Sequence, residues 1–166
     1  MAGDWNGNGT DTVGLYHPKT GTFYLTNSNT NGEADITFRL GPKNANGLKP
    51  LSGNWDGDGV DSVGLFNTAT STFYLKNALS TGKAETIVNL ETDGFDNLRP
   101  ISGDWNNGGI DTVGLFIQDK TSASNNRFLL KDNHNSGATD IEIDAPYVVT
   151  EGLLPVFPIS GNRDRI

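Results

Sequence analysis

The sequence predicts an all-β fold, and three observations lead to this prediction. The chain has 166 residues, and its 21 glycines and 7 prolines favour many turns and short elements over long helices. Short apolar runs alternate with turn residues along the chain. A string that begins Gly-Asp-Trp or Gly-Asn-Trp recurs at Gly3, Gly53 and Gly103, with a period of 50 residues. A single domain made of repeated β units accounts for all three observations.

Each repeat predicts four short strands. The first precedes the Gly-Asp/Asn-Trp string, and the second follows it with apolar residues on both faces, which indicates burial between layers. The third is rich in aromatic residues, and the fourth alternates apolar and polar residues as a half-exposed outer strand does. The predicted ranges are 48–52, 98–102 and 156–160 for the first strand, 13–16, 63–66 and 113–116 for the second, 22–25, 72–75 and 127–130 for the third, and 36–40, 87–90 and 141–143 for the fourth.

Four antiparallel strands in about 50 residues is the pattern of a β-propeller blade. Residues 1–166 are therefore predicted to form one propeller domain of three four-stranded blades, which span 3–52, 53–102 and 103–160. No predicted first strand precedes the second, third and fourth strands of the first repeat, whereas 153–160 is a predicted first strand that no second, third and fourth strands follow.

Propellers have about four to eight blades, so three blades are too few to close a ring. We therefore expect a homodimer that closes a six-bladed ring, in which 153–160 of each chain completes the first blade of the other. A fragment of a longer propeller, a higher ring and a strained three-bladed monomer are the alternatives.

The composition excludes several classes of partner. The net charge is −8, and the 12 lysines and arginines are scattered, which argues against binding to nucleic acid. No apolar stretch approaches the ~18 residues of a membrane helix, and Met1 runs directly into patterned sequence, so neither a membrane segment nor a signal segment is expected. The absence of cysteine excludes disulfides and thiolate metal sites.

Three strings carry a resemblance to a known family. They are GDWNGNGTDTVGLY at 3–16, GNWDGDGVDSVGLF at 53–66 and GDWNNGGIDTVGLF at 103–116, each followed by a strand similar to TGTFYL. They resemble the FG-GAP and VCBS repeats of bacterial secreted proteins and of integrin α-subunit propellers, over nearly the whole chain. The resemblance implies propeller blades whose first loop can hold Ca²⁺, in extracellular or cell-surface modules for adhesion, scaffolding or ligand binding. It implies no enzymatic activity.

The loop around each tryptophan presents oxygen ligands in a pattern that suits calcium, which prefers about six to eight oxygens. Asp or Asn stands at alternate positions, glycine at the sixth and a backbone carbonyl at the seventh. The second loop fits best, and the third is weakest because Gly108 replaces a ligand. The candidates are Asn54, Asp56, Asp58, Val60 and Asp61 in the second loop, Asp4, Asn6, Asn8, Thr10 and Asp11 in the first, and Asp104, Asn106 and Asp111 in the third.

Two questions stay open for these loops. The last carboxylate of the family usually stands one residue further along, where this chain has threonine or serine. Asp11, Asp61 and Asp111 therefore either reach the ion through a tightened loop or accept backbone N–H bonds as turn caps. Asn-Gly and Asp-Gly are also ordinary turn formers, so a metal-free turn explains the same strings.

Trp5, Trp55 and Trp105 occupy the same place in the three loops and allow two functions. Exposed indoles would stack on sugar rings and make a carbohydrate-binding propeller, whereas buried indoles would pack between neighbouring blades. His17 and His134 stand outside the repeated positions, and no nucleophile elbow surrounds any serine, so no enzyme is expected. The leading hypothesis is a non-catalytic, calcium-binding module for assembly or adhesion, and the alternative is a lectin-like module.

Overall fold

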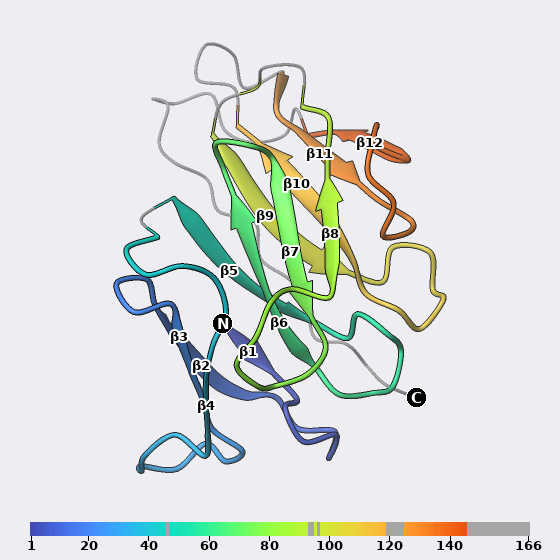
Figure 1. The fold of residues 1–166 in the computed structure, drawn as a ribbon. Coiled ribbons are helices and arrows are strands. Elements are labelled where there is room, and N and C mark those ends of the chain that lie inside the picture. Colours follow the sequence, from blue (N-terminus) through green and yellow to red (C-terminus); the bar gives the residue numbers. More distant parts are fainter. Residues whose placement is uncertain (46, 93–94, 96, 119–124, 146–166) are drawn as a thin grey trace, which may run out of the picture.

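The computed structural model describes residues 1–45, 47–92, 95, 97–118 and 125–145. The described residues form β-strands and no α-helix, which confirms the predicted all-β fold (Figure 1). The strands are β1 (Ala2–Gly3), β2 (Thr12–His17), β3 (Thr22–Leu25), β4 (Ile36–Arg39), β5 (Leu48–Gly53), β6 (Ser62–Asn67), β7 (Thr72–Lys76), β8 (Thr86–Asn89), β9 (Leu98–Gly103), β10 (Thr112–Ile117), β11 (Arg127–Leu130) and β12 (Ile141–Asp144).

The strands form three antiparallel four-stranded sheets, one for each repeat. The first sheet has the order β1-β2-β3-β4, the second β5-β6-β7-β8 and the third β9-β10-β11-β12. The register repeats as well, because Leu15 lies opposite Tyr24 and Leu65 lies opposite Tyr74. Figure 1 shows the second sheet between the first and the third.

The first sheet contains a first strand of its own, so the expectation that it lacks one is wrong. Ala2 and Gly3 pair with Val13 and Thr12, whereas β5 pairs with β6 along all six of its residues. A strand of two residues shows no alternation, so periodicity could not reveal it. The predicted partner strand 153–160 lies outside the described residues.

The apolar core lies between the sheets, in two clusters. Each sheet has one face that carries the tryptophan, the phenylalanines and the leucines, and an opposite face that carries the valine and leucine of the second strand. In each pair of consecutive sheets, the first of these faces, on the earlier sheet, packs against the second, on the later sheet. We call these the forward face and the rear face, and the contact between two sheets a seam. The first seam contains Trp5, Phe23, Leu25, Phe38 and Leu40 with Val63 and Leu65, and the second contains Trp55, Phe66, Phe73, Leu75 and Val88 with Val113 and Leu115.

The glycine in the middle of the second strand makes room for the forward face. A Cβ on Gly64 would lie 2.9 Å from Cδ2 of Leu75 and 3.0 Å from Cδ2 of Leu51, which are the cross-strand neighbours of the glycine. Gly14 and Gly114 are equally crowded by a leucine of the following strand, at 2.7 Å. Gly64 therefore allows leucines from both neighbouring strands to meet over the second strand, and Gly14 and Gly114 leave room for the leucine of the following strand.

Candidate functional site

The three candidate loops connect the first and second strands, so they lie at the same end of their sheets as the hairpins between the third and fourth strands. Side chains join the two kinds of loop. Asn29 Nδ2 donates to the carbonyl of Asp11 at 3.0 Å, and Asn106 Nδ2 donates to the carbonyl of Asp132 at 3.3 Å. In the first and third repeats, the candidate loop is thus tied to the neighbouring hairpin of its own sheet.

In the first and third loops the leading carboxylate is used by the turn itself. Asp4 Oδ1 accepts the N–H of Asn8 at 3.0 Å, and its Oδ2 accepts the N–H of Gly9 at 2.7 Å. Asp104 makes the same two bonds, with Gly108 at 2.9 Å and Gly109 at 2.8 Å. Both oxygens of each carboxylate therefore already stabilise the loop.

The second loop leaves more of its oxygens available. Asn54 takes the leading position and accepts the N–H of Gly57 at 2.9 Å. Asp56 Oδ1 accepts from Asp58 at 3.2 Å, and Asp58 Oδ1 accepts from the N–H of Val60 at 2.8 Å. Within the described part of the chain, Oδ2 of Asp56 and of Asp58 has no hydrogen-bond partner. Asp56 and Asp58 are exposed, and each thus retains one oxygen that the turn does not use.

The other amide ligands act as Asx-turn acceptors. Asn6 Oδ1 accepts the N–H of Asn8 at 3.2 Å, and Asn8 Oδ1 accepts the N–H of Thr10 at 2.8 Å. Asn106 Oδ1 accepts the N–H of Gly108 at 2.9 Å. Among the described residues, no three carboxylate or imidazole side chains come together as a metal cage. A cation at any loop would therefore depend on amide and main-chain oxygens in addition to the carboxylates.

Asp61 and Asp111 link each loop to the loop of the preceding repeat. Asp61 Oδ2 accepts the N–H of Asp4 at 2.9 Å, and the N–H of Asp61 donates to the carbonyl of Asp4 at 2.8 Å. Asp111 makes the same pair of bonds with Asn54, at 2.7 and 2.8 Å. We call this paired contact the loop bridge. One of the two alternatives for these aspartates was that they accept backbone N–H groups as turn caps. Both carboxylates accept a backbone N–H, but that N–H belongs to the loop on the other side of the seam.

The seams contain two further repeated polar contacts. The N–H of Gly82 donates to the carbonyl of Arg39 at 3.2 Å, and that of Gly137 donates to Asn89 at 2.8 Å. Ser52 Oγ donates to the carbonyl of Ala2 at 2.7 Å, and Ser102 Oγ donates to that of Ser52 at 2.6 Å. Each seam is therefore defined by the same hydrogen bonds as well as by the same apolar residues.

The tryptophans belong mainly to the seams. Trp5 and Trp55 are buried, at 3% and 4% exposure, whereas Trp105 in the third sheet is half-buried. Trp55 Nε1 donates to the carbonyl of Val63 at 3.3 Å. In the described part of the molecule, Nε1 of Trp5 and of Trp105 has no partner. Two of the three indoles thus offer no open ring face to a ligand.

No family model, curated protein or solved structure matches this chain. The function is therefore argued from the geometry of the loops and seams. As for membranes, the described residues contain no helix with the length and apolar character of a membrane span.

His134 has a structural contact that its sequence position did not reveal. The residue lies in a loop, its side chain is half-buried, and its Nε2 lies 3.0 Å from the carbonyl oxygen of Asp111. Its ring meets Trp55 edge-on, with centroids 6.3 Å apart. Burial lowers the pKa of His134, which favours the neutral imidazole in the folded protein. The residue stands outside the repeated positions, so no pattern marked it.

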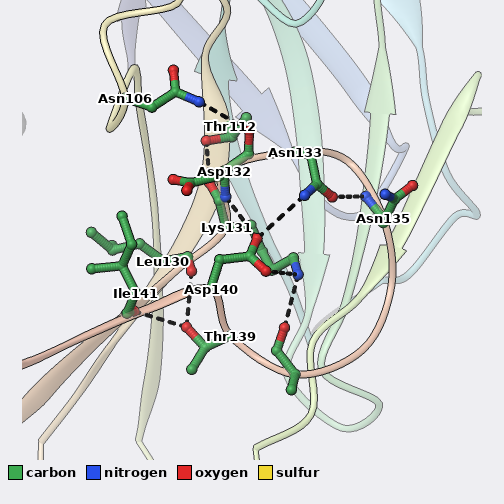
Figure 2. Close-up of polar contacts among 11 residues, drawn as sticks. Asn106, Thr112, Leu130, Lys131, Asp132, Asn133, Asn135, Thr139, Asp140 and Ile141 are labelled. Atoms are coloured by element: carbon green, nitrogen blue, oxygen red, sulfur yellow. Dashed lines mark hydrogen bonds and ion pairs between the residues drawn. The ribbon is translucent and has the colours of Figure 1, made fainter.

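The hairpins between the third and fourth strands contain a repeated acidic residue that the sequence analysis missed. Asp35, Glu85 and Asp140 accept the N–H of Asn27, Asn77 and Asp132, at 2.7, 2.9 and 2.8 Å respectively. In two sheets a buried lysine also pairs with this acid, Lys76 with Glu85 and Lys131 with Asp140, each at 3.0 Å. Figure 2 shows the third example, in which Lys131 and Asp140 close the loop. The recurrence of an acid just before each fourth strand was the available signal.

These hairpins predict a defined acid sensitivity. The hydrogen bond from Lys76 holds the pKa of Glu85 below its ordinary value. Its contribution to stability is complete above the ordinary glutamate pKa and is lost as the pH falls through the lower pKa of the folded state. We expect Glu85→Gln to reduce the loss of stability on acidification, by a modest amount because Glu85 is exposed. Denaturant unfolding at neutral and acidic pH measures this. The exposed Glu33→Gln variant is the control, and an equal effect in both variants would contradict the assignment.

A cavity of about 750 Å³ lies at the first seam, near the chain between β4 and β5. Its lining includes Leu40, Leu48, Leu65, Tyr74 and Ile87. Lys83 is the one charged side chain among the described lining residues. At the second seam, by contrast, Phe95 packs against the core cluster. The cavity is an apolar space in the first seam, and its described lining supplies no acid or imidazole for catalysis.

Proposed function

We propose that this chain is a non-catalytic, calcium-binding module of the β-propeller type that serves assembly, adhesion or scaffolding through self-association. The observation that carries the proposal is the repeated seam. Each seam has the same two apolar faces and the same loop bridge. Repeats whose forward face fits the rear face of the next repeat can stack in a longer row or close into a ring.

The second loop supports the calcium part of the proposal. Asn54, Asp56, Asp58 and the carbonyl of Val60 would hold the ion, because Asp56 and Asp58 are exposed and each retains an oxygen that the turn does not use. The ion would neutralise two neighbouring carboxylates and tie the loop together. Asp61 is engaged in the loop bridge, so its part in the assembly is the contact with Asp4.

The buried indoles favour assembly over the carbohydrate-binding alternative. A sugar-binding face would require open aromatic rings, whereas Trp5 and Trp55 lie in the seams. The resemblance of the loops to secreted and cell-surface repeats supports an extracellular role for this chain. A glycan array tests the alternative directly, since binding of a defined sugar would favour the lectin.

Calcium is expected to raise the melting temperature of the protein. A site that forms only in the folded chain adds about 2.7 kcal/mol of stability when free calcium is at 100 times its Kd. Thermal unfolding in millimolar calcium and in excess chelator measures the effect, and calorimetric titration gives the number of sites. Identical melting curves under the two conditions would contradict calcium binding.

The second loop is expected to dominate the calcium affinity. Asp58→Ala removes a charge and an oxygen, and should therefore weaken binding more than Asn8→Ala, which removes only a neutral oxygen. Glu33→Ala is the matched control, because it removes an exposed carboxylate outside the loops. An affinity lowered equally by all three variants would point to general electrostatics.

A further inference from the structure

We propose that the rear face of the first sheet is a docking surface for the forward face of the third sheet of a second copy of this chain, so that two copies close a ring. This inference rests on the proposed assembly role and names the surfaces that carry it. Three features of the two end sheets support it.

The first feature is the exposed rear face of the first sheet. Val13 and Leu15 are 57% and 72% exposed, and Tyr24 beside them is 40% exposed. The residues at the same positions of the second and third sheets, Val63, Leu65, Val113 and Leu115, are at most 1% exposed. They are covered by the forward face of the preceding sheet. The first sheet thus presents the same apolar surface without its cover.

The second feature is the forward face of the third sheet. Ile143 is 46% exposed, whereas its counterparts Phe38 and Val88 are 3% and 0% exposed. Trp105 is half-buried, unlike the buried Trp5 and Trp55. Ile143 and Trp105 on this face are thus less covered than their counterparts, whereas Leu130 and Phe116 of the same face are 5% and 2% exposed.

The third feature is the loop bridge, because the first loop holds the aspartate position of this contact and the third loop holds the backbone position that such an aspartate binds. Asp61 and Asp111 each bind the backbone of the preceding loop, at Asp4 and Asn54. Asp11 holds the same position in the first loop, and it is exposed. Asp104 holds the position of Asp4 and Asn54 in the third loop. A second copy places Asp11 beside the backbone of Asp104.

A second copy fits better than a contact within one chain. Figure 1 places the first and third sheets on opposite sides of the second, and the exposed Leu15 shows that the third sheet of the same chain does not cover it. A head-to-tail contact either closes a ring or grows without limit. The described residues form three sheets, and two copies of them make a ring within the range of about four to eight blades that propellers adopt.

Light scattering of the eluting protein over a range of concentrations tests the proposal. We expect twice the 17.8 kDa mass of one chain. Leu15→Lys should weaken the dimer roughly 100-fold or more, because it places a charge in the centre of the contact. Ile87→Lys is the control. Ile87 is as exposed as Val13 but lies on the second sheet, so this change should leave the dimer intact.

A mixing experiment distinguishes the head-to-tail contact from other dimers. Leu15→Lys and Ile143→Asp are each expected to be monomeric. Their equal mixture should recover a dimer, because one contact is intact and the other gains a lysine opposite an aspartate. Failure of the mixture to associate, in variants whose circular dichroism matches the wild type, overturns the head-to-tail arrangement.

The other outcomes are equally decisive. A wild-type monomer at micromolar concentration, or a mass above that of two chains, overturns the two-chain ring. A wild-type dimer that Leu15→Lys leaves intact overturns the docking surface but not the proposed assembly role. Calcium-dependent melting of the same samples tests the metal part of that role separately.

Discussion

Replacing Trp55 with alanine is expected to lower the free energy of unfolding by about 3–5 kcal/mol. The indole is buried in the second seam, where it packs in the same cluster as Val113 and Leu115 of the third sheet. The substitution would leave a cavity between two sheets and would remove the hydrogen bond from Nε1 to the carbonyl of Val63. Chemical denaturation followed by far-ultraviolet circular dichroism measures the loss.

Two variants separate the contributions to this effect. Trp55→Phe retains an aromatic ring and should lose less stability than the alanine variant. Trp105→Ala removes the same residue type from a half-buried position and should cost clearly less than Trp55→Ala, provided that both are measured in the monomeric Leu15→Lys background. Equal losses at positions 55 and 105 would show that the seam does not determine the effect.

The second large effect is expected for Asp61→Ala, at about 1.5–3 kcal/mol of destabilisation. Asp61 is buried, and its Oδ2 accepts the N–H of the buried Asp4 at 2.9 Å. Truncation leaves that N–H without its acceptor in a place that water does not reach, which costs more than an exposed hydrogen bond. The free energy of unfolding in excess chelator measures the change without a contribution from metal.

Asp11→Ala is the matched control for Asp61→Ala. The two residues share one position in the repeat, but Asp11 is exposed and precedes any seam within the chain. In the Leu15→Lys background, Asp11→Ala should change stability by less than about 0.5 kcal/mol. Asp61→Asn should fall between the two, because it keeps an oxygen but loses the charge. A large effect of Asp11→Ala in that background would place the role of these aspartates inside their own loops.

The strands could be predicted well from the sequence because the same pattern of apolar runs and turn residues recurs in each repeat. The predicted 22–25 and 127–130 coincide with β3 and β11, and the other predicted strands within the described residues differ by at most one residue at either end. The missing element was β1, which is too short to alternate. Its position was nevertheless marked, because Gly3 aligns with Gly53 and Gly103, the last residues of β5 and β9.

The seams could not be predicted in the same way. Val13 and Val63 hold the same position in their repeats, yet the first is exposed and the second is buried, because the forward face of the first sheet covers Val63. Asp61 could be recognised as a turn cap, but the loop that it binds is 57 residues away and is brought close only by the stacking of sheets. Sequence patterns indicate which residues share a face of a sheet, but they do not indicate which sheet packs against that face.

The seam also determines how opening of the structure is distributed along the chain. Among the described residues, the second sheet takes part in two seams, whereas the first and the third take part in one each. In a row of similar units, stability is a sum of unit terms and nearest-neighbour terms, so the end units open at lower free energy than the central one. We therefore expect local unfolding of the monomer to begin in the first and third sheets and the amides of β6 and β7 to exchange last. The proposed ring would give every sheet two neighbours and would abolish this gradient.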